Sequence, residues 1–181
     1  FCDEISQKFR DLSKILNLTN TDFIRTTEER HKKSVQNLWN NLKKNDDIYL
    51  SKYSGWYSVS DEAFYTEDEI EEIDGIKKAI SSKSSVEWMD EESYFFRLSK
   101  WEKPLLDFYE KNPDFISPPS RRNEVISFVK RGLNDLSVSR KSFSWGIKVP
   151  DNNEHVIYVW LDALTNYISA LNYPNINDQL F

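Results

Sequence analysis

Glycine and cysteine are scarce in this chain of 181 residues, which holds four glycines and a single cysteine, Cys2. The glycines stand at positions 55, 75, 132 and 146, a spacing that forms neither a Walker phosphate loop nor a dinucleotide fingerprint. One cysteine excludes an internal disulfide and a zinc site built from cysteines. A reducing compartment fits this composition.

Long apolar runs are also missing. No stretch approaches the roughly 20 apolar residues of a membrane span, and the start, Phe1 to Glu4, has no secretory signal pattern. Met89 is the only methionine, so the sequence is expected to be processed or excised material. The net charge of −6 argues against a protein that coats nucleic acid, although a local basic face remains possible.

A complete set of catalytic residues is not visible. His31 and His155 lie far apart, outside any metal-ligand spacing, and no serine or cysteine sits in a nucleophile elbow. The acidic pairs Glu71–Glu72 and Glu91–Glu92 are interpreted as solvated surface, because adjacent residues of a helix or strand point apart.

The first part of the chain predicts two helices around a strand. Residues 3–16 place apolar side chains at helical spacing, so one stripe should face a core. Residues 22–25 indicate a short buried strand. Thr26 and Glu29 form a capping box, which predicts a helix to about residue 44. The apolar stripe of the first predicted helix, residues 3–16, consists of Ile5, Phe9, Leu12 and Leu16.

The middle of the chain predicts an α+β region. Residues 48–65 and 86–98 are rich in aromatics and indicate antiparallel strands. Thr66 and Glu69 form a second capping box, which predicts a short helix ending at Gly75. Further helices are predicted over 101–112, with Pro104 in the first turn, and from a Ser120 cap to Gly132.

The last part predicts a strand followed by a helix. The unbroken apolar run of residues 155–161 is typical of a central parallel strand covered on both faces. A helix is predicted over 163–172. The two ends therefore predict an α/β fold, and we expect the α+β middle to be inserted into it.

The end of this strand is the best candidate site, since α/β sheets bind ligands beyond the carboxyl ends of strands. Trp160 offers an indole wall, Ala163 leaves room, and Tyr167 closes the side and can hydrogen-bond. The set would suit a slim apolar side chain. The alternative is an ordinary strand–helix core containing two aromatics.

Several segments, spread over nearly the whole chain, form a distinctive set. They are FIRTTE at 23–28 with Arg30–His31, GWYSV at 55–59, ESYFFRLS at 92–99, SRRNEV at 120–125, DLSVSR at 135–140 and YVWLDALTNY at 158–167. Taken together, these segments resemble the methionyl-tRNA synthetases, and they occur in that family's order.

The resemblance implies part of a class I, Rossmann-like nucleotide-binding fold interrupted by a connective domain. Residues 1–27 would end the first half of that fold, 28–135 would form the connective domain, and 136–181 would begin the second half. Such enzymes activate methionine with ATP and Mg²⁺ to methionyl-adenylate and transfer it to tRNA(Met). The implied location is the cytoplasm, or the mitochondrial matrix for an organellar enzyme.

The resemblance also assigns residue roles. Trp160, Ala163, Leu164 and Tyr167 match positions that line the methionine side chain, although some members have proline in place of Leu164. Arg140 matches an arginine near the active site, where it can pair with a carboxylate or a phosphate. Asp162 either orients the pocket or caps the following helix.

Two departures from the family pattern stand out. Many members carry a zinc knuckle whose first two ligands are cysteines with two residues between them. Here Ser58 and Asp61 occupy that spacing, and the second pair of zinc ligands is absent around residues 81–85. We expect a knuckle without zinc, held by aromatic packing, as in the α-proteobacterial and mitochondrial branch. The His-Ile-Gly-His and Lys-Met-Ser-Lys-Ser signatures, which contact ATP, should lie outside residues 1–181. The chain alone is therefore expected to be inactive.

Contacts with tRNA are a separate expectation. Arg121 and Arg122, at a helix start, are the better candidates for phosphate contact. The central aromatics, which include Trp56 and Trp88, interleave with Arg97 and Lys100; they either stack on RNA or pack in a core. The alternative function is a non-enzymatic module, derived from a connective domain, that binds RNA or a protein.

Overall fold

A computed structural model describes residues 1–61, 63–142 and 144–175. Residues 176–181, the end of the third predicted segment, lie outside the described residues. The chain divides into two compact units. The first unit joins Phe1–Leu38 to Val159–Phe181, and the second is Trp39–Tyr158.

Helix α1 (Cys2–Ile15) confirms the first predicted helix but not the core expected beneath it. None of its residues is buried, and Phe9 is 61% exposed. An amphipathic pattern shows which face is apolar, but it does not supply a partner for that face. The prediction that this stripe faces a core is wrong for the part of the chain that the structure describes.

The predicted strand at residues 22–25 is also wrong, since these residues take no regular structure. Side-chain ion pairs hold the segment instead. The Arg30 guanidinium donates to both carboxylate oxygens of Asp22, at 2.6 and 2.9 Å, and to Glu28 at 2.6 Å. Helix α2 (Glu29–Lys44) begins three residues after Thr26, so Thr26 does not cap it.

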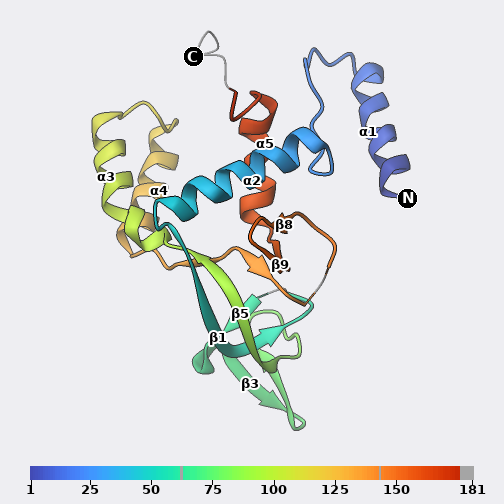
Figure 1. Cartoon of the computed structure of the whole chain (residues 1–181). Helices are drawn as coiled ribbons and strands as arrows, with labels where there is room; N and C mark the ends of the chain where they lie inside the picture. Colours follow the sequence, from blue (N-terminus) through green and yellow to red (C-terminus); the bar gives the residue numbers. More distant parts are fainter. Residues whose placement is uncertain (62, 143, 176–181) are drawn as a thin grey trace. The chain divides into compact units, whose positions relative to one another are not determined.

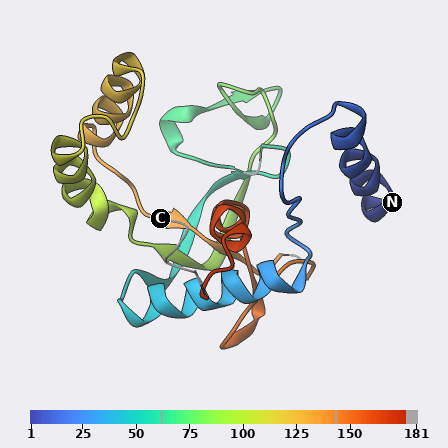
Figure 2. The same cartoon turned by 90° about the horizontal axis from the view of Figure 1, so that it is seen from above.

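Helix α5 (Trp160–Ala170) follows the last strand and confirms the final predicted helix, starting three residues early. Figures 1 and 2 show α2 passing across α5. Within the first unit, polar side chains of α2 and α5 are fully or almost fully buried. These are His31, Ser34, Thr165 and Ser169.

The second unit is built on antiparallel strands, as predicted for the middle of the chain. Long strands β1 (Ile48–Ser58) and β5 (Glu87–Phe96) pair from Ile48 opposite Phe96 to Tyr57 opposite Glu87. Strands β2 (Ala63–Tyr65) and β6 (Leu136–Ser137) complete a sheet in the order β2-β1-β5-β6. Figure 1 shows β1 and β5 extending together.

The apolar run of residues 155–161 is divided between a strand and a helix. Strand β9 (Asn152–Ile157) lies between β7 (Ser139–Arg140) and β8 (Lys148–Val149), and both pairings are antiparallel. The predicted parallel strand is therefore wrong. Its burial was anticipated correctly, because three consecutive residues, His155 to Ile157, are buried. Hydrophobicity reports burial, whereas strand direction depends on the chain connections. The fold is a mixed α/β one whose strand pairs, in the described residues, are antiparallel.

The second capping box forms, but it begins a shorter element than predicted. Glu69 accepts hydrogen bonds from the N–H and hydroxyl of Thr66. Only the 3₁₀ turn η1 (Glu67–Glu69) follows, and the chain then enters the hairpin of β3 (Ile70–Ile73) and β4 (Ile76–Ala79). Gly75 turns this hairpin with a φ of +76°, a conformation that favours glycine.

Two helices lie side by side in the second unit (Figure 2). The 3₁₀ turn η2 (Leu98–Trp101) leads into α3 (Glu102–Lys111), with Pro104 in the first turn as predicted. Helix α4 (Pro119–Lys130) is capped by Pro118 rather than Ser120. Pro119 is the first residue of α4, a position that suits proline because the backbone N–H it lacks would have no partner within the helix. Among the described residues, no helix has both the length and the apolar character that a membrane crossing requires.

Candidate functional site

The residues predicted to bind methionine share one exposed face of α5. Trp160, Ala163, Leu164 and Tyr167 occupy helix positions i, i+3, i+4 and i+7, which lie on one side. Trp160 is 56% exposed and Tyr167 is 70% exposed, so neither is a core residue of the first unit. A rise of 1.5 Å per residue separates the two aromatic positions by roughly 10 Å along the axis. The small Ala163 side chain lies between them.

Asp162 points from the same helix turn toward α2. It is the third residue of α5, and Val159 occupies the cap position, so Asp162 is not the cap. Its Oδ1 atom lies 2.8 Å from Nε2 of His31, which is fully buried. Sequence reasoning missed this contact because 131 positions separate the two residues.

Arg140 is buried on β7, where its guanidinium contacts neighbouring protein groups. Its guanidinium donates to the Ser137 hydroxyl and, at 2.9 Å, to the Ser139 carbonyl. Nε lies 3.9 Å from Glu91, and the group stacks over the Tyr158 ring at 4.2 Å. Nε itself is buried without a hydrogen-bond partner, and the pairing of Arg140 with a carboxylate or a phosphate at the active site stays a prediction.

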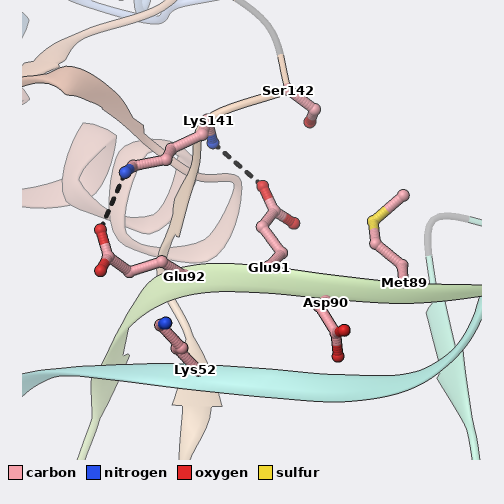
Figure 3. A pocket seen from close by; sticks show the side chains of 7 residues that line it. All are labelled: Lys52, Met89, Asp90, Glu91, Glu92, Lys141 and Ser142. Carbon is pink, nitrogen blue, oxygen red and sulfur yellow. Dashed lines mark hydrogen bonds and ion pairs between the residues drawn. The ribbon is translucent and has the colours of Figure 1, made fainter.

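A hollow of about 580 Å³ lies between β1, β5 and the segment after β7 (Figure 3). Figure 3 shows Lys141 reaching toward Glu92 while its backbone nitrogen bonds Glu91. Sequence reasoning did not predict this hollow, since Glu91 and Glu92 were interpreted as solvated surface residues. It is lined by Lys52, Met89, Asp90, Glu91, Glu92, Lys141 and Ser142.

One lysine at this hollow, Lys141, is paired with two carboxylates. Lys141 Nζ lies 2.8 Å from Glu92 and 2.9 Å from Glu154. The hydrogen bond from Lys141 lowers the pKa of Glu92, and the bond to Glu92 raises the pKa of Lys141. Lys141 is therefore held by its two carboxylate partners.

The two arginines predicted to contact tRNA have different surroundings on α4. Arg121 is exposed and pairs with Glu124 at 2.6 Å, one turn along the helix. Arg122 is half-buried and donates to the Tyr109 carbonyl at 3.0 Å, while its Nε is buried without a hydrogen-bond partner. Arg121 alone of the two presents its charge to solvent.

The knuckle is closed by hydrogen bonds that converge on Asp61. Its carboxylate accepts from the hydroxyls of Ser82, Ser84 and Tyr65, and its N–H donates to Ser58 Oγ. These bonds, first the one from Ser82, lower the pKa of Asp61. The sequence predicted closure by aromatic packing in place of zinc. Rings do meet here, Tyr57 against Phe64 and Trp56 against Trp88, but the polar cluster joins the two chain segments.

Within 1–61, 63–142 and 144–175, no cluster of three or more His, Cys, Asp or Glu side chains is placed to hold an ion.

Comparison with known proteins decides the family. A family model described as tRNA synthetases class I (M) matches residues 1–180. The chain belongs to the class I methionyl-tRNA synthetases. This confirms the resemblance drawn from the sequence segments.

Individual members of the methionyl-tRNA synthetase family agree closely with the chain. It is 62% identical to a methionine–tRNA ligase of Rickettsia typhi over 97% of its length, and 54% identical to that of Brucella suis over 98%. The chain spans about a third of the length of these relatives, 34% in each.

Solved structures of the family superpose on the same region. A Mycobacterium tuberculosis methionyl-tRNA synthetase in complex with methionyl-adenylate matches 96% of the chain at 48% identity, with a TM-score of 0.81. The free form of that enzyme matches with a TM-score of 0.79. In each case the matched part is about a third of the solved chain, 34% and 35%.

Proposed function

We propose that this chain supplies part of the methionine pocket and the connective domain of a methionine–tRNA ligase. The enzyme would activate methionine with ATP and Mg²⁺ to methionyl-adenylate and transfer the methionyl group to tRNA(Met). The strongest support is the agreement, over 96% of the chain, with a structure determined in complex with methionyl-adenylate. On this proposal, residues 28–135 form the connective domain between the halves 1–27 and 136–181.

The exposed face of α5 is suited to a thioether side chain. Aromatic rings at Trp160 and Tyr167 offer favourable sulfur contacts, and Ala163 leaves space between them. Leu164 would add apolar surface beside Ala163. The Tyr167 hydroxyl remains able to hydrogen-bond the polar end of a bound amino acid.

The remaining residues of the ligase proposal have supporting roles. Arg140, held by Ser137, Ser139 and Glu91, is placed to maintain a positive charge on β7 rather than to move freely toward substrate. Contacts to ATP would come from the His-Ile-Gly-His and Lys-Met-Ser-Lys-Ser signatures, which residues 1–181 do not contain. We therefore expect residues 1–181 alone to lack activity.

Substitution of Trp160 tests the proposal. In the protein expressed from its complete reading frame, Trp160→Ala should raise the KM for methionine about ten- to a hundredfold in methionine-dependent ATP–pyrophosphate exchange, because truncating an aromatic anchor commonly has that effect. The KM for ATP should stay nearly constant.

Trp88→Ala is the matched control, since Trp88 is 54% exposed and lies on β5. It should leave the KM for methionine unchanged. An equal effect of both variants would contradict the pocket assignment. Absence of any exchange activity in the unmodified protein would instead favour the non-enzymatic RNA- or protein-binding module.

A further inference from the structure

The two sides of α5 have opposite character. Trp160 and Tyr167 are exposed on one side, whereas Thr165 and Ser169 are each 2% exposed on the other. Asp162 belongs to the buried side, because its carboxylate contacts α2. The helix therefore presents its proposed methionine face outward while polar contacts hold its back.

His31 is the centre of these contacts. Its ring is fully buried, with Nε2 2.8 Å from Asp162 Oδ1 and Nδ1 3.0 Å from Ser169 Oγ. An ionised carboxylate only accepts, so Nε2–H of the imidazole donates to Asp162. One ring thus holds α5 at its first turn and again seven residues later.

The direction of the second bond does not change this result. The Ser169 hydroxyl has one proton and two neighbours, His31 Nδ1 and the Thr165 carbonyl at 2.9 Å. It donates to Nδ1 when His31 is neutral, and to the carbonyl when His31 is an imidazolium. In both states Nε2–H donates to Asp162.

The position of Asp162 in the helix makes this bond consequential. Asp162 stands two residues after Trp160 and one before Ala163, so a rotation of this turn moves both pocket residues together. Displacements of about 1 Å in a binding site can reduce activity about a hundredfold. The bond resists such rotation, because breaking it leaves the fully buried His31 ring without this partner.

We propose that His31 is a positioning residue for methionine, which acts through Asp162 by fixing the orientation of the first turn of α5. This inference rests on the proposed function for its substrate. His31 contacts Asp162 and Ser169 on the buried side of α5, so the role proposed for His31 is positioning and not catalysis.

Three variants in the protein expressed from its complete reading frame test the proposal. Asp162→Ala removes the acceptor and should raise the KM for methionine about ten- to a hundredfold, with less than a twofold change in the KM for ATP. Asp162→Asn keeps an oxygen that accepts from Nε2–H and should restore the KM to within about threefold. Ser169→Ala removes the second contact and should raise the KM for methionine less than Asp162→Ala does.

Ser34→Ala is the matched control. Ser34 is another buried α2 residue, and its hydroxyl donates at 2.7 Å to the Tyr173 carbonyl beyond the end of α5. The Ser34→Ala variant should lower the thermal midpoint of unfolding without changing the KM for methionine. An equal rise in Ser34→Ala, or a parallel rise in the KM for ATP, would overturn the positioning role. If Asp162→Ala does not fold, Ser169→Ala decides, and an unchanged KM for methionine in that variant refutes the proposal.

Hydrogen exchange of the peptide amides of residues 160–170 provides a readout that needs no methionine. Asp162→Ala or Ser169→Ala should speed exchange in the first turns of α5, whereas Ser34→Ala should not. Unaltered exchange in both α5 variants would overturn the positioning role even in an active enzyme. Faster exchange in a protein without methionine-dependent activity would contradict the ligase function while supporting the ordering of α5 by His31.

Discussion

His155 is a buried side chain whose protonation state follows from its neighbours. Its Nδ1 lies 2.9 Å from Ser139 Oγ, which itself accepts from the Tyr94 N–H at 2.8 Å. In the Nε2–H tautomer of the ring, Nδ1 accepts from the Ser139 hydroxyl, and in the Nδ1–H tautomer it donates to that oxygen. Burial lowers the pKa of His155 below its ordinary 6.5, against the opposing effect of Glu92. The folded protein thus favours the neutral ring.

This depressed pKa predicts a loss of stability in mild acid. The unfolded chain binds a proton at His155 more readily, so its contribution to stability is complete well above pH 6.5 and declines as the pH falls through that value. Urea unfolding between pH 7.5 and 5 measures the decline. His155→Asn, which retains an acceptor toward Ser139, should show a shallower pH dependence. We expect it to be about 1–3 kcal/mol less stable at pH 7.5. Identical slopes in both proteins would refute this explanation.

At the scale of an element, the knuckle depends on Asp61. Asp61→Ala removes the common acceptor of Ser82 and Ser84, so amides of residues 80–85 should exchange faster, and the thermal midpoint should fall. The lowered pKa of Asp61 means that its contribution is present above the ordinary value of 3.8 and is lost as the pH falls below it.

Chelation provides the complementary test of the knuckle. If the oxygen contacts close it, as we propose, excess chelator should leave the thermal midpoint of the purified protein unchanged. A midpoint that falls with chelator and returns with added Zn²⁺ would show that a metal supports this region.

Elements with strong local signals were predictable from the sequence. The alternating aromatics of β1 and β5 and the prolines around α3 and α4 fixed both their type and their approximate ends. Residues 22–25 and 155–161 were harder, because a strand is defined by its partner and apolar composition does not identify one. Residues 22–25 are held by ion pairs and form no strand. Residues 155–161 are divided between the end of β9 and the start of α5.

The candidate site shows the same limit. Spacing alone placed Trp160 and Tyr167 on one face, because seven residues complete about two turns. The bond between His31 and Asp162 could not be predicted, since it joins residues 131 positions apart. Side-chain chemistry identifies a group that requires a partner, and only the folded chain determines which partner it finds.

At the scale of the whole molecule, the net charge of −6 confines RNA binding to local patches. Arg121→Ala should weaken tRNA(Met) binding by a few-fold and reduce the salt dependence by about one phosphate contact. Arg122→Ala should instead lower stability, because it removes a bond to the Tyr109 carbonyl. Filter binding across a salt series, with thermal unfolding of each variant, separates the two effects. A larger binding defect in a fully stable Arg122→Ala would reverse the assignment.

The cluster around Asp61 also bears on oxidative damage. Each contact recorded there joins oxygen to oxygen or a backbone nitrogen to oxygen. Peroxide attacks thiolates and carries them to sulfinic and sulfonic acids, which no longer hold a metal. Hydroxyl and carboxylate groups undergo no such change. The closure at Asp61 should therefore survive peroxide exposures that open a knuckle held by cysteines.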